Sequence, residues 1–164
     1  MLTFEDKKAL AAKGEDCFIL AECFFDRHFP RPTYYFNQRG RSAGTAHLQK
    51  NIIKFNPILY SQNKQIFIEQ VVAHEIAHLL TYQMFGKVRP HGKEWQAIMT
   101  QVFKVPASTT HQLDVSDVEG KLFTYRCDCS EHQLTIRRHN KIKKGTTYLC
   151  RQCKSALVFV EVNS

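Results

Sequence analysis

The feature that most constrains this chain is the pair of histidines in His74-Glu75-x-x-His78. In a helix, residues i and i+4 lie one turn apart on the same face, so a helical backbone would place both imidazoles side by side. Two imidazoles so placed can bind one Zn²⁺, and Glu75 beside them is a candidate general base. Zinc hydrolases use three protein ligands and leave the fourth position for water. The motif therefore predicts a helix, a third ligand elsewhere in the chain and an accessible cleft.

The sequence around this motif is typical of a buried helix. We predict that the helix runs from about Gln65 to Phe85, because apolar residues recur on most of its faces. Gly86 is a typical residue to end it. A buried, charged Glu75 would be costly without a partner, whereas a bound metal and an open cleft would remove that cost. The competing interpretation is a structural helix that carries two partly buried histidines.

A third zinc ligand should come from a nearby element that can turn back. His91 lies thirteen residues after His78, beyond the Gly86–Pro90 loop, at the predicted start of a helix that reaches Val102. Catalytic zinc prefers nitrogen ligands, which favours His91. The alternatives at this stage are other groups that can bind zinc: Glu94, His47 and His111.

The region before the motif predicts a long helix followed by a small sheet. Thr3 and Asp6 are typical of a helix N-cap, and the helix is expected from Phe4 to about His28, before Pro30. Three β-prone stretches follow, and we expect them to form a small antiparallel sheet: Thr33–Phe36, Gly44–Leu48 and Asn51–Asn56. An exposed edge of this sheet is a candidate surface for binding an extended peptide by strand addition.

The last forty residues carry a second metal constellation. Cys150-x-x-Cys153 has the spacing of half a structural zinc site. The other half is irregular, because Cys127 and Cys129 are only two apart while His132 follows Cys129 at the usual interval. We favour Cys127 and Cys129 because thiolates bind structural zinc more tightly, with His132 as the alternative ligand. The competing interpretation is a group of buried free thiols.

Positive charge is concentrated around these cysteines. The net charge of the chain is +8, and residues 121–154 hold nine Lys and Arg against two acidic residues. This distribution is typical of a domain that contacts a polyanion, most simply nucleic acid. We expect a basic hairpin whose side chains contact phosphates without reading sequence: Arg137, Arg138, Lys141, Lys143 and Lys144. Tyr125 and Tyr148 flank it and either stack on bases or pack the domain. A solvated basic turn is the competing interpretation.

Length and composition limit the remaining possibilities. We expect 164 residues to divide into two domains, 1–120 and 121–164, joined by the polar stretch 107–121. No apolar run is long enough to span a bilayer, and the N-terminus does not resemble a secretory signal, so we expect a cytoplasmic monomer with no membrane partner. In the cytosol, cysteines are typically metal ligands or buried free thiols and not disulfides. Cys17 and Cys23 lie on different faces of the first helix, and we interpret both as buried thiols.

Several motifs together carry a resemblance to a known family. They are Gly40-Arg41-Ser42-Ala43-Gly44-Thr45-Ala46, Asn56-Pro57, His74-Glu75-Ile76-Ala77-His78-Leu79-Leu80, His91-Gly92-Lys93-Glu94-Trp95 and the terminal cysteine cluster. The combination resembles the SprT family, which includes the Spartan-type proteases that act on DNA-bound proteins. The resemblance implies an α+β fold: a zincin-like helical domain with a small antiparallel sheet, then a zinc-ribbon-like β subdomain. It also implies that His74, His78 and His91 bind zinc and that Glu75 is catalytic.

These observations lead to one functional expectation and one alternative. We expect a zinc metalloendopeptidase that hydrolyses protein substrates associated with or crosslinked to DNA, with one catalytic and one structural Zn²⁺. In such a site Glu75 takes a proton from a zinc-bound water and passes it to the leaving amine. The alternative is a nucleic-acid-binding zinc protein without protease activity, in which the helix of His74 and His78 has only a structural role.

Overall fold

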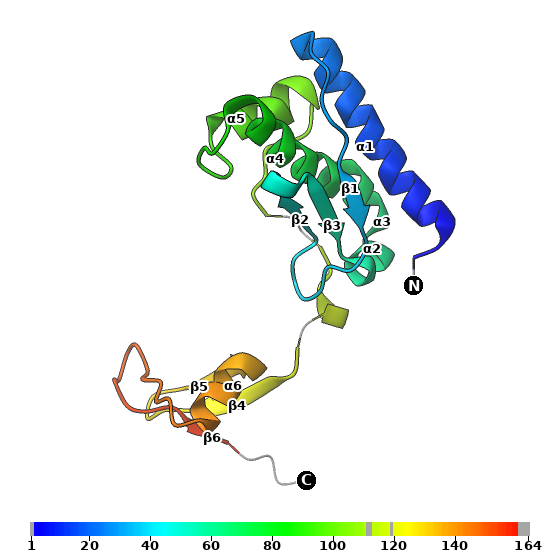
Figure 1. The fold of residues 1–164 in the computed structure, drawn as a ribbon. Helices are drawn as coiled ribbons and strands as arrows, with labels where there is room; N and C mark the ends of the chain where they lie inside the picture. Colours follow the sequence, from blue (N-terminus) through cyan, green and yellow to red (C-terminus); the bar gives the residue numbers. More distant parts are fainter. Residues whose placement is uncertain (1, 111–112, 119, 161–164) are drawn as a thin grey trace. The chain divides into compact units, whose positions relative to one another are not determined.

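The computed structural model describes residues 2–110, 113–118 and 120–160, which belong to two compact units (Figure 1). The first unit is Met1–Val118 and the second is Glu119–Ser164. Each has its own sheet. Within the described residues, no helix is both long enough and apolar enough to cross a membrane.

The first unit begins with helix α1, Phe4–Phe25. As predicted, Thr3 caps it: the Asp6 backbone N–H donates to the Thr3 hydroxyl, and the Thr3 N–H donates to the Asp6 carboxylate. The helix ends slightly earlier than predicted, where Asp26 adopts a left-handed conformation. Cys17 faces the core and is buried, whereas Cys23 is exposed. The prediction that both thiols are buried was therefore wrong for Cys23, because it lies on the solvent-facing side of α1.

Three strands form the sheet of the first unit, in the order β1-β3-β2: β1 Thr33–Tyr35, β2 Gly44–His47 and β3 Ile52–Phe55. Strands β2 and β3 are antiparallel, as expected, and a 3₁₀ turn, η1 Leu48–Lys50, joins them. Strand β1, however, runs parallel to β3, so the expectation of an all-antiparallel sheet was wrong for this strand. The chain between β1 and β2 crosses to the far side of β3 and leaves β2 at an edge.

The helices that follow the sheet of the first unit begin directly after β3. Asn56 caps α2, Pro57–Gln62, by accepting a hydrogen bond from the Ile58 N–H at 3.1 Å. Its side-chain amide donates to the Gly40 carbonyl at 2.7 Å and so also fixes the loop before β2. This short helix was not predicted, although Asn followed by Pro is typical of a helix start.

The predicted helix around the motif is present, starts one residue early and has an irregular first half. It consists of α3 Lys64–Ile66, the π-helical segment η2 Phe67–Val71 and α4 Val72–Phe85. Gly86, at a φ of 69°, ends it as expected. The next helix comprises α5 Lys93–Ala97 and the π-helical η3 Ile98–Val102.

The expected linker after η3 is partly held against the first unit. Leu113, Val115 and Val118 pack against its core, and a short 3₁₀ turn, η4, spans Ser116–Val118. The Asn63 side chain donates to the Asp114 carbonyl at 3.0 Å and accepts from the Asp114 N–H at 2.9 Å. This paired contact fixes the path of the chain beside α2.

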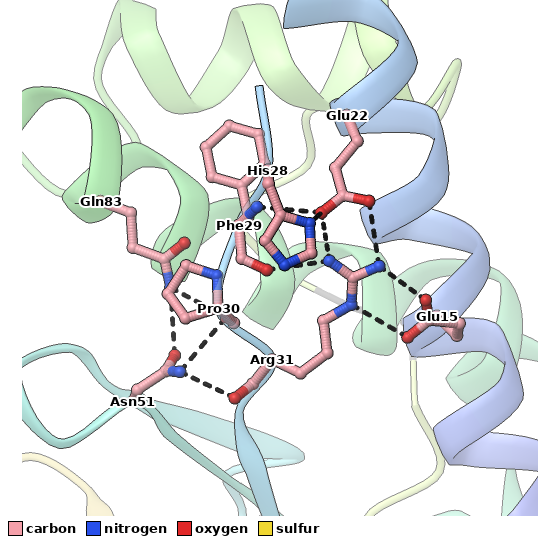
Figure 2. A network of polar contacts seen from close by, with 8 residues as sticks. All are labelled: Glu15, Glu22, His28, Phe29, Pro30, Arg31, Asn51 and Gln83. Atoms are coloured by element: carbon pink, nitrogen blue, oxygen red, sulfur yellow. Dashed lines mark hydrogen bonds and ion pairs between the residues drawn. The ribbon is translucent and has the colours of Figure 1, made fainter. Parts of the chain in front are cut away.

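A polar network on Arg31 connects α1 to the start of β1 (Figure 2). The guanidinium donates to the carboxylates of Glu15 and Glu22, at 2.6 Å for Glu15 Oε1. The Phe29 N–H also donates to Glu22, at 2.9 Å. The hydrogen bonds from Arg31 and Phe29 lower the pKa of Glu22 to about 2.

The same network reaches the sheet and the central helix through Asn51 (Figure 2). The Asn51 amide donates to the carbonyls of Pro30 and Arg31, at 3.2 and 2.9 Å. The Gln83 amide, on α4, donates to the Asn51 side chain at 3.1 Å. Elements α1, β1, β3 and α4 are thereby held in one arrangement around the core.

The second unit is a small sheet with one helix. Its strands are β4 Leu122–Arg126, β5 Glu131–Thr135 and β6 Val158–Phe159, antiparallel in the order β5-β4-β6. The expected basic hairpin is instead a helix, α6 Ile136–Lys143. The reason is His139, a buried residue on one side of this polar segment. Its ring stacks on Phe123 at 3.8 Å between centroids, and its Nδ1 lies 2.9 Å from the Tyr125 hydroxyl.

Candidate metal centres and their surroundings

Three histidines of the first unit converge on one point. His74 and His78 lie one turn apart on α4, and His91 follows the loop after that helix. The Nε2 atoms are 3.2 Å apart between His74 and His78, 3.1 Å between His78 and His91, and 3.1 Å between His91 and His74. The same nitrogen of each ring therefore faces the same small volume.

A tight turn brings His91 back to the helix. His91 has a φ of 55°, and the Gly92 N–H donates to the Arg89 carbonyl at 3.0 Å. The Gln96 amide donates to the His91 carbonyl at 3.0 Å and holds the turn on α5. This geometry explains how a loop of a few residues reverses the chain, as the sequence suggested.

The alternative ligands are not part of this cluster. Among the described residues, the histidine group that could hold a metal ion comprises His74, His78 and His91. Glu94 lines the same hollow as His91 beside the turn but is not in that group, and His47 lines another hollow at the end of β2. His111 lies outside the described residues.

Trp95 packs against all three histidines. Its ring centroid lies 4.8 Å from that of His74, 5.5 Å from His78 and 4.7 Å from His91. The indole N–H also donates to the His74 carbonyl at 3.3 Å. Trp95 is fully buried, so it fixes the orientation of the rings. The sequence identifies Trp95 only as an apolar helix residue and as part of a family motif, and its contact with the histidines was not predicted.

The chemistry of the three histidines fits a zinc ion. A tetrahedral zinc site with Zn–N bonds of 2.0–2.1 Å would place its nitrogens about 3.3 Å apart, close to the observed spacing. Burial lowers the pKa of His78 to about 4, and it also lowers the pKa of His91. Both rings are thus neutral at pH 7, which is the form that binds a metal.

Glu75 lies beside the histidines and is held by strand β2. Its carboxyl group is buried, and burial raises its pKa to about 8, while a hydrogen bond from the Ala46 backbone N–H acts in the opposite direction. A nearby cation favours the ionised form of a buried carboxyl. A β-carbon added at Gly44 would lie only 2.8 Å from Glu75 Cγ and 3.0 Å from Oε1. Only glycine therefore allows β2 to approach the carboxylate this closely.

Glu75 and His74 open into a cleft of about 360 Å³. One wall is the segment before and within β2, and the other is the segment after η3. The lining residues are Arg41, Ser42, Ala43, Gly44, His74, Glu75, Thr109, Thr110, Leu113 and Val115. A substrate that enters this cleft can reach the carboxylate and the first histidine together.

The second unit brings four cysteines together. The Sγ atoms of Cys127, Cys129, Cys150 and Cys153 lie within 4.8 Å of one another. Cys129 Sγ is 3.4 Å from Cys127 and 3.7 Å from Cys150, close to the spacing of about 3.8 Å in a tetrahedral site with Zn–S bonds near 2.3 Å. His132 is outside this group, and its Nε2 contacts the Cys127 sulfur at 3.2 Å. The arrangement favours four thiolates, with His132 as a hydrogen-bonding neighbour.

The five predicted phosphate-binding residues lie on or next to α6, and all are exposed: Arg137, Arg138, Lys141, Lys143 and Lys144. Of the two tyrosines, Tyr125 is 1% exposed and packs the unit, so it is not available for stacking on a base. Tyr148 is half-buried and lines a hollow of about 630 Å³ together with Arg138.

Comparison with known families agrees with this division into two units. The pattern of the SprT-like family matches residues 14–111, which include the three histidines and Glu75. The pattern of the SprT-like zinc ribbon domain matches residues 121–161, which include all four clustered cysteines. The second metal cluster is therefore part of a zinc ribbon.

Individual relatives align over most of the chain. The protein SprT of Shewanella oneidensis is 54% identical over 87% of this chain and 92% of its own length. The protein SprT of Actinobacillus succinogenes is 54% identical over 92% of this chain and 89% of its own length. That of Vibrio parahaemolyticus is 52% identical over 90% of both chains. No solved structure matches the chain.

Proposed function

The chain belongs to the SprT-like family, and from this premise we propose that it is a zinc-dependent metallopeptidase. The observation that carries the proposal is the meeting of two features in one place. The Nε2 atoms of His74, His78 and His91 converge within 3.2 Å of one another. The Glu75 carboxyl lines the same cleft as His74. A structural histidine cluster has no need for a buried carboxyl that opens to a cleft.

His74, His78 and His91 would hold the zinc ion, which would supply a Lewis acid to polarise the scissile carbonyl and lower the pKa of water. Glu75 then acts as general base: its carboxylate takes one proton from the attacking water as the oxygen bonds to the carbonyl carbon. Glu75 returns that proton to the amide nitrogen as the C–N bond breaks, so the products are a carboxylic acid and an amine. Trp95 supports the zinc-binding His74, and the Ala46 N–H holds the Glu75 carboxylate in place.

The edge of β2 is the proposed support for the substrate backbone. The Asn56 N–H donates to the Ala43 carbonyl at 2.8 Å, so the backbone N–H and carbonyl of Ala43 point toward β3. Because these groups alternate along an antiparallel strand, the backbone groups of Gly44 and Ala46 point away from β3, toward the free edge of β2. The Ala46 N–H is bonded to Glu75, which leaves the Gly44 N–H and the Ala46 carbonyl for an extended peptide. The substrate would then lie beside the general base.

The ribbon is the proposed contact with nucleic acid. Five cationic side chains on or next to α6 are exposed, and His139 anchors this helix from its other side. Such a surface binds phosphates without reading sequence. Attachment to DNA would direct the peptidase to proteins bound or crosslinked there. This proposal also explains how a protease in a cell could be confined to few substrates.

The proposed reaction is tested by cleavage of a DNA-bound protein by the wild-type chain and by Glu75→Gln. The substitution keeps the size of the side chain but removes the base, so cleavage should fall by at least about 10²-fold while zinc content stays at two per chain. Full cleavage by this variant would refute the mechanism. One zinc per chain and no cleavage by wild type would favour the alternative, a nucleic-acid-binding zinc protein without protease activity.

The proposed DNA contact is tested by titration at several salt concentrations. Arg137→Gln/Arg138→Gln/Lys141→Gln should reduce the slope of log affinity against log salt by about two to three. Arg126→Gln/Arg151→Gln/Lys154→Gln is the matched control, because it also removes three exposed charges from the ribbon but outside α6. An unchanged slope for the triple variant would exclude α6 as the contact.

A further inference from the structure

A further hollow lies on the first unit, at the end of strand β2 away from Gly44. It has a volume of about 390 Å³ and is lined by His47, Leu48, Gln49, Lys50, Tyr82 and Lys87. Two of these residues are lysines and one is a histidine, and none is acidic. We refer to it as the basic hollow.

The basic hollow lies along the same path as the cleft. Strand β2 packs against α4, with Gly44 next to Glu75 at one end and His47 in the same hollow as Tyr82 at the other. Three residues of strand cover about 10 Å, and the seven helical residues from Glu75 to Tyr82 cover about 10.5 Å. The strand from Gly44 to His47 and the helix from Glu75 to Tyr82 therefore span the same length side by side. An extended chain along β2 would pass from the cleft to the basic hollow.

The distance from the zinc histidines to the hollow corresponds to a short stretch of peptide. Tyr82 lies one turn, about 6 Å, beyond His78 on α4. An extended peptide rises about 3.3 Å per residue, so the hollow faces a side chain two to three residues from the scissile bond. This is the range within which proteases commonly select their substrates by side chain.

We propose that the basic hollow is a specificity subsite that binds an acidic side chain of the peptide substrate, preferably glutamate. The inference rests on the proposed peptidase function and names a feature of its substrate. Tyr82 and Leu48 provide apolar walls for the methylene groups of glutamate, and Lys50 and Lys87 provide cations for its carboxylate. A phosphate of nucleic acid would use the lysines but has no need for apolar walls, so the peptide side chain is the better match.

The test uses a series of peptides that carry Glu, Gln or Lys at one position at a time, from three residues before to three residues after the cleaved bond. For the wild-type chain, kcat/KM should be about 1.5- to 5-fold higher with Glu than with Gln at one position, the range expected for exposed ion pairs. For Lys50→Glu/Lys87→Glu, the preference at that position should change to Lys over Gln. The matched control Lys8→Glu/Lys104→Glu has the same charge change away from the hollow and should keep the wild-type preference.

The outcomes separate the subsite from the function on which it rests. If wild type cleaves the Gln peptides but shows no preference for Glu at any position, the subsite is refuted and the peptidase function stands. If wild type cleaves no peptide or DNA-bound protein, both fail. If the double substitution weakens binding of an oligonucleotide while the preference for Glu is unchanged, the hollow binds phosphate and the proposal is overturned.

Discussion

Replacement of Gly44 by alanine would test whether strand β2 positions the general base. The new β-carbon would lie 2.8 Å from Glu75 Cγ, 3.0 Å from Oε1 and 3.1 Å from Cδ. Carbon atoms in contact are normally about 3.5–4.0 Å apart, so the carboxyl group or the strand must move by roughly 0.7–1 Å. A misplacement of about 1 Å in a catalytic group can reduce the rate by about 10²-fold.

We expect Gly44→Ala to lower kcat by about 10- to 100-fold while both zinc ions remain bound. The crowding caused by the added methyl group should destabilise the fold by about 1–3 kcal/mol, as is usual for overpacking. The measurements are steady-state kinetics on a cleavable protein, zinc content and the urea midpoint. Gly120→Ala is the control, because a β-carbon there has no atom within 4 Å. Activity near that of wild type, or loss of the catalytic zinc, would show that Gly44 does not act through Glu75.

Three further predictions follow from contacts outside the general base. Trp95→Phe removes the indole hydrogen bond that supports the first zinc histidine and should weaken zinc binding about 10- to 100-fold in a chelator competition; unchanged affinity would contradict the role. Cys153→Ser should lower zinc content from two ions to one, whereas His132→Ala should retain both, as measured by metal analysis. Hydrogen bonds, first from Arg31, lower the pKa of Glu22 from 4.5 to about 2. The stability that wild type gains over Glu22→Gln should therefore be complete above about pH 4.5 and disappear as the pH falls toward 2. If urea unfolding at several pH values shows the same stability difference between the two proteins throughout, this linkage is excluded.

The parts of the fold that local sequence determines were predictable. The Thr3 cap, the helix through His74 and His78 and its end at Gly86 depend on neighbours within a few residues. The turn to His91 was also foreseeable, because loop length alone limits where the chain can return. At these positions, the residues that the cap or the metal site requires also favour the local backbone conformation that is observed.

The parts that depend on distant contacts were not predictable. The direction of β1 is set by a crossover past β3, which no local pattern records. Helix α6 forms on Phe123 and Tyr125 through one buried residue, His139, in a segment whose composition is typical of a solvated turn. Likewise, nothing in the sequence marks Gly44 as the neighbour of Glu75.

The hydrogen bond from the Ala46 N–H to Glu75 also gives the molecule a way to become inactive. Strand β2 is four residues long and has a strand partner on one side only among the described residues, and such segments open at a lower free energy than a core helix. Local opening of β2 would release the base and remove the support for the substrate at the same moment. The histidines, held on α4 and by Trp95, would keep the metal throughout. A partly unfolded molecule would therefore still hold zinc but lack the proposed peptidase activity.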